Sequence, residues 1–342
     1  MDSKLVSRNS SIDFFRYICA IMVIAIHTKP FTDVNGNLGF IFSEITTRVG
    51  VPFFFCVSGY YYIQKLENGR PLNKYLIKLM LPYVVWSCVY FLLDFIQWGH
   101  EDLSSFAFNC IYGFFISGSY YHFWFFPALI YSVILTTIIF KSKLKKLLIP
   151  ISIVLYIFGC IGCAYYKISV NIPVFGKLFE SQYFDLIRRI LLMGFPFFIS
   201  GYVVFKLNSH FSKNFSQIKS LSAIFISTLL WLSEIYIVCK FEIQKNIVIT
   251  LFLYPLLVAI MLYLVNYPHS ELYKISNHTG VIANFAYYSH PLFIVIINKI
   301  YSNVSSNSIP ETIMFFIVII ITTLLSYILS CSQNKIIRKI IC

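Results

Sequence analysis

Charged residues are scarce in this sequence. Asp, Glu, Lys and Arg make up 12% of its 342 residues, whereas a soluble domain carries about a quarter. No polar stretch is long enough to form a separate soluble domain. The scarcity of charge therefore argues against an ordinary soluble protein and predicts a single membrane-embedded domain over residues 1–342.

Several patterns of soluble enzymes are also missing. The sequence has no Gly-rich phosphate loop, no His-Glu-x-x-His pair and no Gly-x-Ser-x-Gly elbow. Its nine cysteines fall largely in or beside apolar runs, where a thiol behaves as a small hydrophobic group. Cys160 and Cys163 have Cys-x-x-Cys spacing but lack a second pair. We therefore expect neither a disulfide framework nor a metal site.

Long apolar runs take the place of these patterns. Hydrophobic residues make up 58% of the chain, and runs near twenty residues recur along its length, each long enough to cross a bilayer. Continuous runs of this length are typical of helices, because the strands of membrane barrels alternate over short segments. The sequence predicts an all-α, polytopic protein with ten transmembrane helices, near 11–29, 46–64, 76–97, 122–140, 147–165, 187–206, 221–239, 247–265, 281–299 and 312–330.

The distribution of basic residues predicts the orientation. If the N-terminus lies inside, 17 of the 27 Lys and Arg residues fall in inner segments and nine in outer segments, while Arg16 lies within the first span. This excess follows the positive-inside rule and predicts that both termini are cytoplasmic. A basic inner surface beside anionic lipid accounts for the net charge of +13 without a nucleic-acid partner. We expect a multi-pass protein of a bacterial plasma membrane.

The first span contains two polar residues on one helix face. Arg16 and His27 are eleven residues apart, which is about three helical turns plus 20°, or roughly 16 Å along the axis. Ionisable side chains are expensive in a bilayer, so they usually face a partner or a cavity. An arginine that reaches toward the inner surface and a histidine at the outer interface remain alternatives.

More polar residues are predicted near the outer ends of other spans. Each alone fits anchoring at the interface, but together they could line an outward-opening cavity. They are Arg48 before the second span, His122 and Trp124 at the start of the fourth, and Arg188 and Arg189 at the start of the sixth. His290 lies near the middle of the ninth span and precedes Pro291. It is either a functional residue or a buried, hydrogen-bonded histidine.

These residues carry a resemblance to a known family. The segment 11–16, continued through 24–27, resembles the opening of the acyltransferase-3 family of bacterial membrane O-acyltransferases, in which ten residues separate an arginine from a histidine. Weaker matches follow in order at 48–59, 121–125, 196–202 and 290–291. The chain also resembles the membrane half of vancomycin-resistance serine racemases. It leaves no room for the racemase domain, so we expect a stand-alone transferase.

The resemblance implies transfer of an acyl group, usually acetyl, from acyl-coenzyme A to a hydroxyl of a cell-surface glycan or a lipid-linked acceptor. His27 suits the general base, because the ordinary pKa of histidine lies near neutrality. Arg16 would hold a phosphate or the carbonyl of the donor. Asp94 or Glu234 is a candidate for orienting the His27 ring. The outer residues, from Arg48 to Arg189, are candidates for acceptor binding, and His290 is a further candidate for the substrate site.

Two other classes of function remain open. A transporter for a small polar solute such as serine would place polar residues in the same spans. Transporters often contain inverted repeats, and none is convincing between residues 1–165 and 187–330. A scaffold or sensor without turnover would leave the Arg16–His27 pair without a role. The membrane O-acyltransferase is therefore the favoured prediction.

Overall fold

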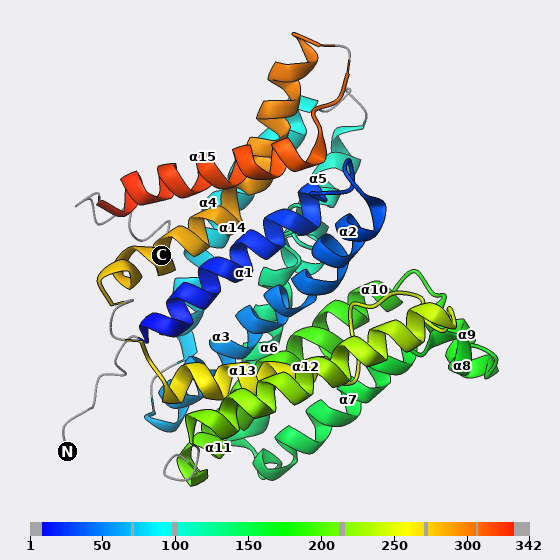
Figure 1. Cartoon of the computed structure of the whole chain (residues 1–342), viewed down its shortest axis with the longest axis vertical. Coiled ribbons are helices and arrows are strands. Elements are labelled where there is room, and N and C mark those ends of the chain that lie inside the picture. The colour runs from blue at the N-terminus through cyan, green and yellow to red at the C-terminus, as the bar shows by residue number, and fades with distance from the viewer. Residues whose placement is uncertain are drawn as a thin grey trace. The chain divides into compact units, whose positions relative to one another are not determined.

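The computed structural model describes residues 9–69, 72–97, 102–211, 216–269, 273–305 and 307–331, and every regular element in these ranges is a helix (Figure 1). The predicted all-α class is confirmed. The described helices that are long and apolar enough to cross a membrane number eight: Ser10–Thr28, Gly36–Glu67, Leu72–Gln97, Lys145–Gly162, Phe184–His210, Gln217–Lys240, His278–Ser302 and Glu311–Cys331.

Shorter apolar helices complete the set. The predicted spans 122–140 and 247–265 correspond to α6 (Phe125–Lys141) and α13 (Leu253–Asn266), of 17 and 14 residues. Leu103–Ser117 forms a further short apolar helix that the sequence analysis did not predict. Its apolar run is too short to resemble a membrane span. The predicted cytoplasmic termini lie outside the described residues, and so do inner basic residues such as Lys4 and Arg338.

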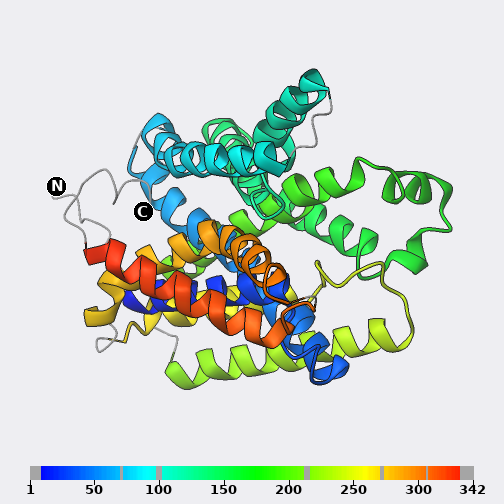
Figure 2. The same ribbon diagram turned by 90° about the horizontal axis from the view of Figure 1, so that it is seen from above.

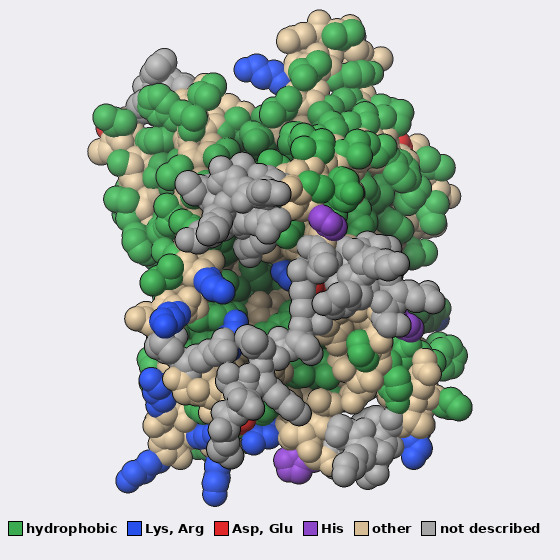
Figure 3. Space-filling view, turned by 90° about the vertical axis from the view of Figure 1, so that its left-hand side faces the viewer, with side chains coloured by type: hydrophobic (Ala, Val, Ile, Leu, Met, Phe, Trp, Pro, Cys, Tyr) green, Lys and Arg blue, Asp and Glu red, His purple; other side chains and the backbone are tan. Residues whose placement is uncertain are grey.

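Large hydrophobic side chains cover much of the protein surface. Ile77 on α4 (Leu72–Gln97) and Phe225 on α12 (Gln217–Lys240) are 65% and 64% exposed, and hydrophobic side chains dominate much of the face in Figure 3. In water such a surface would aggregate, whereas in a bilayer it faces lipid chains. With the long apolar helices, it identifies a multi-pass membrane protein.

The chain forms two compact units. The first comprises Met1–Gly50, Ser212–Leu221 and Ile260–Cys342, and the second comprises Val51–Phe211 and Ser222–Ala259. Each unit is described by itself below. The predicted organisation as one domain over residues 1–342 stays a prediction.

Three long helices make up most of the first unit. Figures 1 and 2 show α1 (Ser10–Thr28) beside α14 (Tyr273–Ser302) and α15 (Glu311–Cys331). The hydroxyls of Tyr17 and Thr323 are 2.9 Å apart, and the Phe31 N–H donates to the Thr312 hydroxyl at 2.8 Å. Residue numbers therefore rise along α1 as they fall along α15, so the two helices are antiparallel. The predicted first and tenth spans require this direction.

Both ends of α1 are held by specific hydrogen bonds. The Asn9 side chain accepts the Ile12 N–H at 3.1 Å and donates to the Leu264 carbonyl at 2.8 Å. At the other end Lys29 adopts a left-handed conformation, with φ 49°, and its N–H bonds the Ala25 carbonyl at 2.9 Å. These caps satisfy helix-end groups that have no partner inside the helix. They fix the frame in which Arg16 and His27 are presented.

A short chain of helices follows α1 in the first unit: α2 (Gly36–Phe40), η1 (Ile41–Ile45) and η2 (Thr46–Val49). The loop before α2 is tied to the start of α15, because the Asp33 carboxylate accepts both the N–H and the hydroxyl of Thr312. The hydroxyl hydrogen bond lowers the pKa of Asp33 from its ordinary value. This contact joins the loop that follows α1, just beyond His27, to the first turn of α15.

The second unit is built around close helix packing. It contains α3 (Gly50–Glu67), α4, α5 (Leu103–Tyr112), η3 (Gly113–Ser117), α6, α7 (Leu148–Gly162), α10 (Phe184–Ile187), η5 (Arg188–Gly194), α11 (Phe195–Phe211) and most of α12. A Cβ added at Gly59 of α3 would overlap the Phe198 backbone of α11, and one at Gly201 would overlap the α3 backbone. Small residues thus let α3 and α11 approach closely.

A buried carboxylate shapes the chain between α12 and α13. Glu234 is 5% exposed, and its carboxylate accepts the N–H groups of Leu251 and Phe252 at 2.6 and 2.9 Å. It also accepts the Tyr165 hydroxyl at 2.7 Å. The carboxylate therefore satisfies backbone donors just before α13 begins. Glu234 is a structural residue of the second unit.

Candidate functional site

The Arg16 guanidinium is held from two sides in the first unit. Its Nη1 donates to the Asp13 carboxylate one turn earlier on α1, at 3.2 Å. Its Nη2 donates to the Asn284 side-chain oxygen of α14, at 2.6 Å. The Arg16 side chain is 24% exposed and that of Asp13 only 9% exposed. Arg16 is thus a partly buried cation held in one orientation by two helices.

His27 meets a second histidine from the same neighbouring helix. The rings of His27 and His290 stack, with centroids 5.3 Å apart and planes 22° from parallel. His290 is fully buried, whereas His27 is partly exposed. The structure therefore brings together two histidines that are 263 positions apart in the sequence.

The two contacts show that α1 and α14 run parallel. Arg16 pairs with Asn284 and His27 pairs with His290, so residue numbers rise together along both helices. The predicted first and ninth spans require this direction. The partners are six residues apart on α14 and eleven on α1, or about 9 and 16 Å along the axes. The guanidinium and the imidazole pair thus form two separate polar contacts between α1 and α14.

Asn284 is a site residue that sequence reasoning missed. Six residues correspond to about 600° of helix rotation, so an ideal helix places Asn284 roughly 120° from the face of His290. An uncharged amide is also less expensive in a membrane helix than an ionised group. Neither periodicity nor charge singles it out. Only its hydrogen bond to Arg16 does so.

Arg48 also belongs to the first unit. It lies in η2, which packs against α1. Its Nε donates to the Glu44 backbone carbonyl at 2.8 Å, and its Nη2 forms an ion pair with the Glu44 carboxylate. The charge of Arg48 is thus balanced by a carboxylate one turn away, which the sequence analysis did not consider.

The remaining predicted site residues lie in the second unit. The Arg189 guanidinium lies over the Trp124 ring, 5.7 Å from the ring centroid. The Asp185 carboxylate forms ion pairs with both arginines, 2.6 Å from Nη2 of Arg188 and 2.8 Å from Nη2 of Arg189. His122 is 2% exposed, and its ring lies edge-on to the Tyr90 ring, with the ring centroids 5.2 Å apart. The structure therefore groups Trp124 with Arg189. The prediction that these residues share one cavity with Arg48 stays a prediction.

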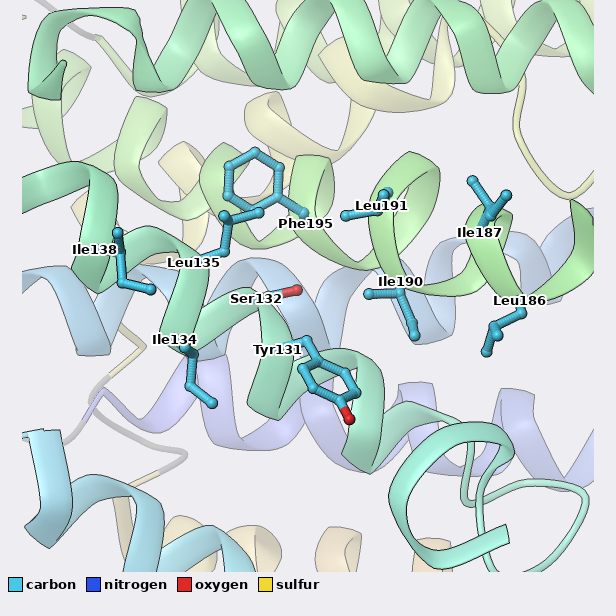
Figure 4. Close-up of a pocket in the computed structure, with 10 residues that line it drawn as sticks. All are labelled: Tyr131, Ser132, Ile134, Leu135, Ile138, Leu186, Ile187, Ile190, Leu191 and Phe195. Atoms are coloured by element: carbon cyan, nitrogen blue, oxygen red, sulfur yellow. The ribbon is translucent and has the colours of Figure 1, made fainter. Parts of the chain in front are cut away.

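An apolar pocket of about 420 Å³ also lies in the second unit (Figure 4). Side chains of α6, α10, η5 and the first residue of α11 line it. Its two hydroxyls are already used, because Ser132 donates to the Ala128 carbonyl at 2.7 Å and Tyr131 donates to the Phe115 carbonyl at 3.0 Å. The pocket lining contains no histidine and no charged side chain.

Metal ligands do not gather in the part of the chain that the structure describes. No group of three or more His, Cys, Asp or Glu residues in these ranges is arranged to hold an ion. Within the described ranges, no third such ligand joins the stacked histidines. The absence of a metal from the reaction stays a prediction.

Comparison with known proteins supports the resemblance predicted from the sequence. The family model described as an acyltransferase domain matches residues 9–331. An amino-acid racemase of Enterococcus faecalis is 29% identical over 339 residues, covering 96% of this chain and 47% of the relative. Another amino-acid racemase of that organism is 30% identical over 241 residues, which cover 69% of this chain and 33% of that relative. A serine/alanine racemase of Enterococcus gallinarum is 30% identical over 175 residues, which cover 49% of this chain and 25% of that relative.

The chain spans about half, or less, of the length of these relatives. No solved structure matches it. The matched family region begins just before α1 and ends with α15. It therefore includes Arg16, His27, Asn284 and His290.

Proposed function

Because the chain belongs to the acyltransferase-3 family, with an acyltransferase domain over residues 9–331, we propose that it is a membrane O-acyltransferase. The donor is a cytoplasmic acyl-coenzyme A, and the acyl group is acetyl. The acceptor is a hydroxyl of a cell-surface glycan or a lipid-linked relative. The observation that best supports this proposal is the meeting of the family's Arg16 and His27 with one helix, α14.

His27 acts as the general base. Its imidazole takes the proton of the acceptor hydroxyl, and the oxygen attacks the thioester carbonyl carbon. The carbon–sulfur bond then breaks, and the imidazolium returns its proton to the leaving thiolate. His27 lies in the last turn of α1, where the negative end of the helix dipole favours a cation. An acyl-histidine intermediate would use the same residue.

Arg16 binds the donor at a distance from the reacting carbonyl. A group that stabilises the oxyanion must lie about 3 Å from it, and the contacts of Arg16 and His27 are separated by about 9 Å along α14. The guanidinium is therefore suited to a phosphate or another charged part of coenzyme A. Its forked donors favour that role. The carbonyl role also considered for Arg16 fits this geometry poorly.

The other polar residues serve the acceptor in this proposal. Arg48 lies beside α1, and Trp124 with Arg189 offers an aromatic surface next to a cation. His122 and Arg188 complete the set. Polar side chains and an aromatic ring suit a carbohydrate or its lipid-linked form. We propose that no metal takes part.

Labelled acetyl-coenzyme A tests the function directly. Inside-out membrane vesicles with the wild-type protein are expected to transfer label to the glycan or lipid fraction. His27→Ala should lower the rate by roughly 10²- to 10⁴-fold, the usual contribution of a general base. Arg16→Ala should raise the KM for the donor. The exposed His210 provides a control, since His210→Ala should retain the wild-type rate.

A transporter would give a different result. In that case wild-type vesicles would transfer no label, and serine uptake would depend on His27. That outcome would overturn the transferase.

A further inference from the structure

Pro291 changes the hydrogen bonding inside α14. It lies within the helix Tyr273–Ser302, directly after His290. Proline has no backbone N–H, so it cannot bond the carbonyl four residues earlier. That carbonyl belongs to Tyr287. The proline therefore leaves a buried acceptor that needs another donor.

His290 provides that donor. Its Nδ1 lies 2.9 Å from the Tyr287 carbonyl oxygen and 3.1 Å from the Ala286 carbonyl oxygen. Carbonyl oxygens only accept hydrogen bonds, so Nδ1 carries the proton. In the neutral ring the lone pair then lies on Nε2. The tautomer follows from the bond that the proline leaves open.

We propose that Pro291 locks His290 in one tautomer and one orientation, and that the locked His290 ring is a positioning residue for His27. The inference rests on the proposed function, in which His27 is the general base. The His290 ring is fully buried and stacks on the partly exposed His27 ring at 5.3 Å. Because the fixed His290 ring packs against one face of the His27 imidazole, it limits rotation of that imidazole.

The lock also suits the charge that His27 gains. When His27 takes a proton, two facing imidazolium rings would repel each other. A neutral His290, with its only proton held by backbone carbonyls, avoids that repulsion. The stack can therefore persist through the reaction.

Pro291→Ala separates this role from a general packing role. The alanine restores an N–H that competes with His290 for the Tyr287 carbonyl, so the shorter of the two hydrogen bonds that hold the Nδ1 proton is weakened. Solid-state NMR of ¹⁵N-histidine-labelled protein in lipid bilayers reports the tautomer, and the His290→Asn spectrum assigns the signal. The wild type should show a protonated Nδ1, whereas Pro291→Ala should show a mixture. Its kcat for acetyl transfer should fall roughly 10- to 100-fold, with KM for acetyl-coenzyme A unchanged.

Two further variants make the test decisive. Pro82 also lies inside a membrane helix, α4, but follows a leucine, so Pro82→Ala should keep the wild-type tautomer and kcat. His290→Asn keeps an amide donor near the Nδ1 position and removes the ring. It should lower kcat without changing KM.

Several outcomes would overturn the inference. They are a protonated Nε2 in the wild type, an unchanged tautomer in Pro291→Ala, and a mixed tautomer with unchanged kcat. If the wild type transfers no acetyl group, the proposed function and the positioning role fall together. The tautomer comparison would still show whether Pro291 controls His290.

Discussion

Arg16 depends on a neutral partner from another helix. The Asn284 oxygen accepts from its guanidinium at 2.6 Å, and Asp13 balances its charge from α1. A hydrogen bond to a charged group contributes about 1.5–3 kcal/mol. In the proposed function, Asn284 therefore fixes the direction in which Arg16 meets the donor.

Replacing Asn284 by leucine should weaken donor binding. We expect Asn284→Leu to raise the KM for acetyl-coenzyme A about tenfold or more, in line with the loss of one such hydrogen bond. The kcat should change little, because Arg16 acts away from the reacting carbonyl. Steady-state kinetics in vesicles measures both constants. Asn298→Leu, at an exposed position of the same helix, is the matched control. A fall in kcat with unchanged KM would contradict this division of roles.

Residue types that are expensive in a membrane can be predicted from sequence. Arg16, His27 and His290 stand out because a charge or an imidazole inside a span needs a reason. Their partners do not stand out in the same way. Asn284 is neutral and off the expected face, and Glu44 and Asp185 lie next to the arginines that they neutralise. The partner of Arg16 on another helix was therefore not predictable, whereas Glu44 and Asp185 lie at helix spacings from their arginines that a single sequence does display.

At the scale of elements, the start of α13 shows where hydropathy misleads. Residues 247–252 read Ile-Val-Ile-Thr-Leu-Phe and favour a span that starts near 247. The helix begins only at Leu253, because the preceding backbone bonds the Glu234 carboxylate instead. The Tyr156 hydroxyl donates to the Thr250 carbonyl at 2.5 Å, which supports the same conformation. Apolar character predicts burial here but not backbone form.

Glu234→Ala should destabilise the second unit. It leaves the N–H groups of Leu251 and Phe252 without their acceptor, at a cost of about 2–4 kcal/mol. Thermal unfolding of the purified protein in detergent should show a lower midpoint. Glu242→Ala is the control, since the Glu242 side chain is largely exposed and pairs with the exposed Lys167. Equal midpoints for the two variants would show that the carboxylate is not structural.

At the scale of the whole molecule, the relative directions of α1, α14 and α15 were predictable, because hydropathy sets the order of the spans along the chain. The parallel α1–α14 pair and the antiparallel α1–α15 pair have the directions that ten alternating spans require. Which spans become neighbours was not predictable. That choice depends on side-chain packing and hydrogen bonds, which leave no periodic signal in a single sequence.

Cysteine accessibility tests the predicted orientation. In a background without the native cysteines, Lys143→Cys should react with a membrane-impermeant thiol reagent only from the cytoplasmic side. Asp102→Cys should react only from outside. Both positions lie in exposed segments between helices. Labelling of position 143 in intact cells would overturn the orientation and with it the cytoplasmic origin of the donor.

The Arg16–Asn284 bond also sets an order of events during biosynthesis. Its partners are 268 residues apart, and chains grow at about 5–20 residues per second. The first helix therefore enters the membrane on the order of 15–50 s before its partner has been made. During that interval Asp13 is the neighbour on the same helix that can balance the arginine. The Arg16–Asn284 contact forms only after nearly all of the membrane domain has been synthesised, so the proposed transfer requires a nearly complete membrane domain.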